Sequence, residues 1–210
     1  MNADGSNGRQ LSFDRRYHSS PAICDKGRSV VYDNDLSGTH HLWKQDLKSG
    51  ASTQLTEGLG EALAQCGEDG SWIFYLGQTT GGQARIFKIP VSGGKPVELS
   101  TDVSISPPFV SHDGKHVLLA AITKEGQVLI RTVSAETGKV ESELAPKETF
   151  DTVVRRAANW MPDNRYVAFG DIRTGTSNLW AQPAIGSGAE KQITHFSSGV
   201  VWNFQYSPFC

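Results

Sequence analysis

Several features that would place a protein in a familiar functional class are missing from this sequence. It has no apolar run long enough to span a bilayer, and its first twenty residues hold no apolar stretch of signal-peptide length. It has no cluster of basic residues, and its formal net charge is -2, whereas a nucleic-acid binder carries a basic surface. We therefore expect no membrane insertion, no nucleic-acid partner and, from the sequence as written, a cytoplasmic location.

Cysteine is scarce. Cys24, Cys66 and Cys210 are an odd number and lack the spacing of metal ligands. Because disulfides are rare in cytosolic proteins, the sequence predicts buried or free thiols rather than a disulfide framework.

Catalytic signatures are missing as well. The sequence has no GxSxG elbow, no HExxH motif and no phosphate-binding glycine loop. We therefore expect a protein that is not an enzyme and that needs no cofactor.

The sequence does contain a repeat. The phrases GRQLS, STQLT, PVELS, ESELA and EKQIT recur at spacings of 44, 44, 45 and 49 residues, with their apolar residues at Leu11, Leu55, Leu99, Leu144 and Ile193. A second series places a turn residue before an apolar strand, at Gly27, Gly70, Gly114 and Asn164. In a third, HLWKQDLKSG, RIFKIPVSGG, VLIRTVSAETG and NLWAQPAIGSG alternate large apolar with polar residues before a glycine turn. That alternation predicts a half-buried strand entering a hairpin.

Each period thus predicts four short strands, and no segment keeps the apolar period of a helix. Four antiparallel strands in about 40 to 50 residues are typical of a β-propeller blade. A solenoid usually has shorter coils, and a sandwich gives no reason for phrases to recur in register. The predicted fold is an all-β propeller with four complete blades, at 13–56, 57–100, 101–145 and 146–194, and with 1–12 and 195–210 as parts of an incomplete fifth blade.

The wording of the repeat also resembles a known family. NADGSNGRQLS, LWKQDLKSGASTQLT, EDGSWIFY and NLWAQPAIGSGAEKQIT are similar to the TolB-like propeller repeat over essentially the whole chain. THFSSGVVWNFQYSP resembles late blades of propellers appended to bacterial transcription regulators and serine/threonine kinases. The chain departs from the pattern where CDKG replaces SPDG and where Phe209 and Cys210 replace the last DG. The resemblance implies the fold and allows periplasmic relatives, but it specifies no activity.

Large apolar residues in register with the repeat are expected to fill the gaps between blades rather than to stack on a ligand. One set lies on the third strand of each blade: Leu42, Trp43, Ile86, Phe87, Leu129, Leu179 and Trp180. The other follows the turn residues: Val30, Val31, Ile73, Phe74, Val117, Leu118, Val167 and Phe169.

One stretch, DNDLSGTHH, has the spacing of a calcium loop at Asp33, Asp35 and Ser37. Its twelfth position is Lys44 rather than a bidentate glutamate, and it coincides with a hairpin turn of the repeat. Aspartate and glycine are ordinary turn residues, so a turn is favoured and calcium is the alternative. His40 and His41 follow, and as neighbours on a strand they should point to opposite sides.

The innermost strand of each blade is the expected place for function. Read with a period of two, one face carries Pro21, Ala64, Pro108, Ala158 and Phe204, and the other carries His18, Ser20, Glu61, Gln65, Arg155, Asn159, Asn203 and Gln205. We expect the polar face to line a central channel, where His18, Glu61 and Arg155 could hold a small anion or a partner's loop. The alternative is a channel that is only wet and polar.

The leading hypothesis is a non-catalytic propeller that binds a protein partner or a small polar ligand, related to the sensory region of a bacterial regulator. The alternatives are an enzyme module, either a propeller gating a peptidase or a lyase of TolB-like fold, and a structural fragment. His18 is the only histidine on the polar face, which argues against a lyase. Because the fifth blade lacks strands, we also expect a homodimer or higher assembly that completes the open ring.

Overall fold

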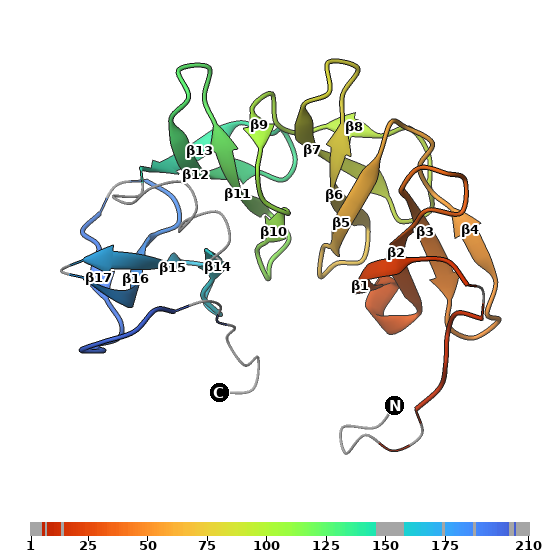
Figure 1. Ribbon diagram of the computed structural model, residues 1–210, viewed down its shortest axis with the longest axis horizontal. Helices are drawn as coiled ribbons and strands as arrows, with labels where there is room; N and C mark the ends of the chain where they lie inside the picture. The colour runs from red at the N-terminus through yellow and green to blue at the C-terminus, as the bar shows by residue number, and fades with distance from the viewer. Residues whose placement is uncertain are drawn as a thin grey trace.

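The structure, a computed structural model, consists of four antiparallel sheets that follow one another along an open arc (Figure 1). It describes residues 6, 8–13, 15–145, 158–173, 175–186, 188–201 and 204. Their regular structure is all strand apart from one turn of 3-10 helix, η1 (Asp25–Gly27), which confirms the predicted all-β partial propeller. None of the helices found in these ranges is long and apolar enough to cross a membrane.

Each sheet contains a four-stranded meander that lies within one of the expected blade segments. Blades 1 and 2 contain β1 (His18–Cys24), β2 (Ser29–Asn34), β3 (His41–Asp46), β4 (Ser52–Gln54), β5 (Glu61–Cys66), β6 (Trp72–Gln78), β7 (Ala84–Pro90) and β8 (Val97–Glu98). Blades 3 and 4 contain β10 (Phe109–Val110), β11 (His116–Ile122), β12 (Val128–Ser134), β13 (Val140–Leu144), β14 (Asn159–Trp160), β15 (Tyr166–Arg173), β16 (Thr176–Pro183) and β17 (Lys191–Gln192). A short extra strand, β9 (Val103–Ser104), pairs with β11.

The turn between the first two strands of each blade requires a left-handed residue, which explains the recurring glycine. Gly70 has a φ of 72° there, and Asn164 occupies the equivalent place in blade 4 with a φ of 55°. Asparagine is one of the few other residues that visit this region readily. Asparagine can therefore replace glycine at this position of the repeat, and the turn is kept.

The core lies between the blades, as predicted. Val31, Leu42, Ile73 and Ile86 are 0% exposed, whereas Trp180 is only partly buried and packs at the edge of the cluster between blades 3 and 4. Three apolar clusters join blade 1 to 2, 2 to 3 and 3 to 4. Because each sheet stands radially, both faces of blades 2 and 3 are packed against a neighbour.

The first strand of blades 1 and 2 carries a β-bulge. The pairing of β1 with β2 shifts between Ser19 and Ala22, and the pairing of β5 with β6 shifts between Ala62 and Gln65. Inside each bulge a residue other than glycine has a positive φ, 50° at Ser20 and 56° at Leu63. A bulge adds one residue to a strand, so residues an even number apart on either side of it lie on opposite faces.

Candidate functional site

The bulges separate the polar residues that were expected to share one channel-facing surface. Glu61 pairs with Gly77, on the face of blade 2 that meets blade 1, whereas Gln65 pairs with Phe74, on the face that meets blade 3. The Gln65 side-chain oxygen accepts a hydrogen bond from the backbone N–H of Val110 at 2.9 Å. The expectation that Glu61 and Gln65 share a face is wrong, because reading the strand with a period of two ignores the added residue.

Glu61 belongs to a buried polar network between blades 1 and 2. Its Oε2 lies 2.6 Å from Nδ1 of His41 and accepts a hydrogen bond from the hydroxyl of Thr56 at 2.8 Å. The Thr56 oxygen in turn accepts a hydrogen bond from the backbone N–H of Leu42 at 2.9 Å. The side chains of His41 and Glu61 are only 8% and 5% exposed. The expectation that Glu61 presents its carboxylate to an open channel is therefore wrong, because this network holds it inside the interface.

Tyr75 lies in the same interface and is 2% exposed. Burial raises the pKa of its phenol far above the usual value, and the nearby charge of Glu61 raises it further. The interface therefore favours the neutral phenol beside the carboxylate.

Of the other expected channel residues, His18 and Asn159, which the structure describes, are not brought together. His18 stacks obliquely on Tyr32, with ring centres 5.2 Å apart, and its Nδ1 lies 3.1 Å from the Asn34 amide nitrogen. It pairs with Asn34 at the start of blade 1, whereas Asn159 pairs with Ala168 in blade 4, at the other end of the arc. Arg155, Asn203 and Gln205 lie outside the described residues, so a binding role for the channel stays a prediction.

The stretch with calcium-like spacing forms a tight hairpin turn, in which the N–H of Gly38 donates to the carbonyl of Asp35 at 2.9 Å. Asp33 is 2% exposed, and its Oδ2 accepts a hydrogen bond from the hydroxyl of Ser19. Ser37 donates to the carbonyl of Thr39 within its own turn. The part of the chain that the structure describes holds no group of three or more His, Cys, Asp or Glu side chains placed to bind a metal. The calcium alternative remains a prediction without that support.

His40 and His41 point to different surroundings, as expected, although β3 begins only at His41. The His40 side chain is 47% exposed and its Nδ1 lies 3.6 Å from Oδ2 of Asp33, while His41 is buried beside Glu61. His40 also meets Tyr17 edge to face, with ring centres 5.9 Å apart. This leaves His40 available to solvent at the junction of the two blades.

A pocket of about 430 Å³ opens at that junction. Its walls come from the hairpin turn of blade 1, the connection into blade 2 and the second hairpin of blade 2, with lining residues that include Gly38, His40, Leu59, Glu61, Gln78 and Ala84. Leu59 is 53% exposed at this site. The pocket therefore combines an apolar contact with an imidazole and an amide, and Glu61 is the one described residue of the predicted polar face that lines it. The sequence singles out the neighbours His40 and His41, but it holds no local signal that His40, Leu59 and Gln78 line one pocket, because these residues come from two different blades.

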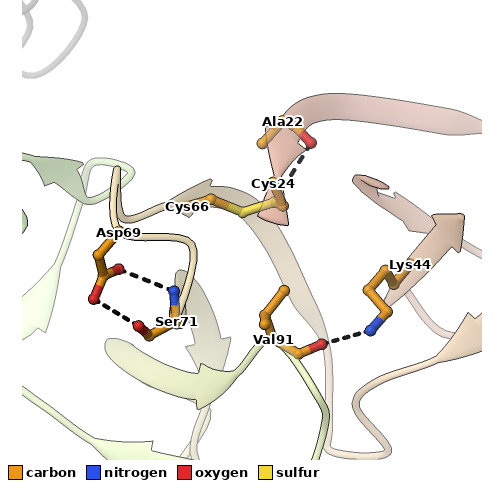
Figure 2. The surroundings of a disulfide bond; sticks show 7 residues. All are labelled: Ala22, Cys24, Lys44, Cys66, Asp69, Ser71 and Val91. Atoms are coloured by element: carbon orange, nitrogen blue, oxygen red, sulfur yellow. Dashed lines mark hydrogen bonds between the residues drawn. A yellow bond between two sulfur atoms is a disulfide. The ribbon is translucent and has the colours of Figure 1, made fainter. Parts of the chain in front are cut away.

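Two cysteines depart from the prediction of free thiols. Cys24 and Cys66 form a disulfide between the ends of β1 and β5 (Figure 2), with their Cα atoms 5.4 Å apart although 42 residues separate them in sequence. The prediction is wrong because adjacent innermost strands lie next to one another in a propeller, so residues about one repeat apart meet. Cys210 lies outside the described residues.

Lysine side chains donate hydrogen bonds across two of the interfaces between blades. Lys44 of blade 1 donates to the carbonyl of Val91 in blade 2 at 2.7 Å (Figure 2). Lys88, at the equivalent position of blade 2, donates to the carbonyls of Ala135 and Glu136 in blade 3 at 2.7 and 2.8 Å. Burial lowers the pKa of Lys88. These hydrogen bonds have a structural role, because they satisfy carbonyl oxygens in a turn of the following blade.

No protein-family model matches the chain, and no curated protein matches it. Solved structures do. TolB from Acinetobacter baumannii is 20% identical with a TM-score of 0.68, over 91% of this chain and 47% of the TolB chain. The chain therefore spans about half the length of that protein.

Two further structures share the arrangement of blades. The β-propeller domain of the Trilobed protease from Pyrococcus furiosus is 13% identical with a TM-score of 0.64, over 88% of this chain and 59% of that one. Oligogalacturonate lyase from Vibrio parahaemolyticus is 13% identical with a TM-score of 0.53, over 87% and 67%. At these identities the likeness concerns the fold and not the activity. The sequence repeat, the four radial sheets and these structural matches together show that the chain has the TolB-like β-propeller fold.

Proposed function

We propose that this chain is a non-catalytic propeller module that binds a protein loop or a small polar ligand in the pocket between blades 1 and 2. The pocket itself supports the proposal, because a concave surface with an apolar contact and a few polar groups is the usual form of a binding site. His40 and Gln78 can each donate or accept a hydrogen bond, and Leu59 offers exposed apolar surface. The module would serve a sensory role like that of propellers in bacterial regulators.

The buried network beneath the pocket supports this role. Glu61 lines the pocket, yet its Oε2 is held by His41 and Thr56. A carboxylate held in this way fixes the shape of the pocket and is poorly placed to act as a base. We infer that Glu61 positions the walls, while His40, Leu59 and Gln78 make the contacts.

The experiment uses two probe sets: a displayed library of random peptides, and a panel of sugars, amino acids and nucleotides screened by thermal shift. We expect at least one probe to bind the wild type, and we expect Leu59→Asp or Gln78→Ala to weaken it about tenfold, since a factor of ten corresponds to one lost contact of about 1.4 kcal/mol. Val140→Asp is the matched control, because Val140 is an exposed apolar residue of β13, in blade 3. The proposal is contradicted if the pocket variants bind the probe as tightly as the wild type, or if the control variant loses as much affinity as they do.

An enzyme module is the second candidate. Its support is the fold likeness to a protease propeller domain and to oligogalacturonate lyase. Metal analysis of the purified protein and an assay for uronate elimination distinguish an enzyme module from a binding module. A lyase of this kind would catalyse elimination on its substrate without a further domain.

We also propose that a second copy of the chain covers blade 1. Three blades carry a cross-strand aromatic pair in the same register, namely Tyr32 with Trp43, Tyr75 with Phe87 and Phe169 with Trp180. The last two pairs pack into the clusters that blades 2 and 4 form with the preceding blade. The first pair lies on the corresponding face of blade 1, where the other copy's blade 4 would pack. A clean monomer of 22.8 kDa by light scattering contradicts this arrangement.

The cytoplasmic location stays a prediction, and the disulfide argues against it. Stable disulfides form in oxidising compartments and are rare in the cytosol. The Cys24–Cys66 bond therefore favours an exported protein, which agrees with the periplasmic relatives that the sequence resemblance allowed.

A further inference from the structure

The disulfide joins the two blades that form the pocket. Cys24 is the last residue of β1 and Cys66 is the last residue of β5 (Figure 2). Cys24 is 2% exposed and belongs to the apolar cluster between blades 1 and 2, with Val31 and Ile73. The covalent link is thus part of the core that aligns the two pocket walls.

The other blade interfaces are joined at the innermost strands by hydrogen bonds. Gln65 bridges blades 2 and 3 through the Val110 N–H, and the Trp160 indole N–H donates to the Phe109 carbonyl at 2.7 Å between blades 3 and 4. Among the described residues, the covalent bridge occurs at the interface of blade 1 alone.

Blade 1 is also one of the two blades whose opening should be easiest. Within one chain, blades 2 and 3 each contribute to two of these apolar clusters, whereas blades 1 and 4 each contribute to one. In repeat architectures each unit contacts its neighbours only, so a unit with one interface separates before a unit with two. A bond placed at this interface therefore limits one of the two blade motions that should cost the least free energy.

We infer that the Cys24–Cys66 disulfide is a redox-controlled clamp on blade 1, and that reduction lets blade 1 open from blade 2 while blades 2 to 4 stay folded. Formation removes two electrons and two protons from the thiols and passes them to a disulfide oxidant, which becomes two thiols. In the reverse direction, a thiolate of a dithiol reductant attacks Cys66 Sγ, because Cys66 is the more exposed of the two residues. The S–S bond breaks, Cys24 leaves and takes up a proton, and the second thiol of the reductant displaces Cys66.

The reduced state has a place for its buried thiol. Cys24 Sγ lies 3.6 Å from the carbonyl oxygen of Ala22. In the disulfide this sulfur carries no proton, so the contact becomes an S–H donor bond only after reduction. Reduced Cys24 would then behave as a small buried apolar residue with a satisfied donor, which allows the bond to form and break without unfolding the whole chain.

The first test counts reactive thiols in the full chain, which has three cysteines. The folded protein, purified from an oxidising compartment and treated with an alkylating reagent, should take up no label at Cys24 or Cys66, and so at most one label in all. After treatment with a dithiol it should take up two labels more, at Cys24 and Cys66. Three labels without reductant would overturn the inference, because the bond would then be absent from the folded protein.

The second test measures amide hydrogen exchange with and without the dithiol. We expect faster exchange in β1 and β2 after reduction and unchanged exchange in β11, β12 and β15. The Cys24→Ser/Cys66→Ser double variant should match the reduced wild type, and Cys210→Ser, the control, should keep the full response. Equal exchange in both states of the wild type, or faster exchange throughout, would overturn the clamp. The oxidised and reduced states of the wild type are compared with each other, so this test still decides the inference if the double variant fails to fold. Failure of the pocket to bind any probe would leave this result unaffected.

Discussion

Replacing Glu61 tests whether the network beneath the pocket holds blades 1 and 2 together. Glu61→Ala removes the one carboxylate oxygen that both His41 and Thr56 address. His41 cannot turn to solvent without leaving its site, since its side chain is 8% exposed. The variant therefore leaves two buried polar groups without their partner.

The expected loss of stability follows from those two groups. A buried group left without its hydrogen-bond partner costs about 1 to 3 kcal/mol, so the two groups orphaned by Glu61→Ala should lower the free energy of unfolding by about 2 to 6 kcal/mol. Glu61→Gln keeps the shape and one acceptor oxygen, so its loss should be about 1 kcal/mol, close to a single net hydrogen bond. A His41→Ala change in the Glu61→Ala background should cost less than in the wild type, because the two residues are in contact.

Urea unfolding followed by tryptophan fluorescence measures these differences. Glu57→Ala is the control, since Glu57 is exposed in the same connection between blades and should change the free energy of unfolding by less than about 0.5 kcal/mol. If Glu61→Ala behaves like Glu57→Ala, the network does not stabilise the interface and the reasoning fails.

Three further predictions concern the same half of the molecule. The disulfide closes a loop of 42 residues, so Cys24→Ser/Cys66→Ser should lower the free energy of unfolding by about 4 kcal/mol, and a loss below about 1 kcal/mol by urea titration would contradict the loop argument. Burial raises the pKa of Tyr75, so the stability that its neutral phenol contributes is fully present below its unfolded pKa of 10.0 and is lost as pH rises through the folded pKa. At alkaline pH the tyrosinate absorbance of the folded protein should therefore correspond to one tyrosine fewer than that of the unfolded protein, and Tyr75→Phe should remove this difference. Hydrogen bonds from the side chain and backbone of Ser71 lower the pKa of Asp69, so stability is present above 3.8 and is lost as pH falls through the folded pKa; Asp69→Asn should lose less stability on acidification than the wild type, and an equal loss would refute the assignment.

Much of the fold could be predicted from the sequence because its signals are local and repeated. A left-handed turn needs glycine or asparagine wherever it occurs, so Gly70 and Asn164 mark equivalent places. The alternation of large apolar and polar residues likewise reports which side of a strand packs, and Leu42 and Ile86 are buried accordingly. Each of these signals depends on a few neighbouring residues, so one sequence is enough to read it.

The candidate site could not be predicted in the same way. Ser20 and Leu63 adopt positive φ values inside bulges, although neither residue type signals such a turn. One added residue reverses the face of everything beyond it, which placed Glu61 and Gln65 on opposite sides of blade 2. A local pattern cannot reveal this, because the bulge is specified by how the strand meets its neighbours.

The contacts between blades also differ at related places, which has a consequence for binding. A disulfide, an amide and an indole join successive pairs of innermost strands, so one interface does not predict the next. Blades 1 and 2 share the disulfide, the Glu61 network and the bond from Lys44 to Val91. These three attachments fix the two walls of the pocket, so the pocket loses little conformational freedom when a ligand fills it. Preorganised walls raise affinity because they reduce that entropic cost. Loosening the inner attachment by reduction should therefore weaken binding even though Cys24 and Cys66 do not line the pocket.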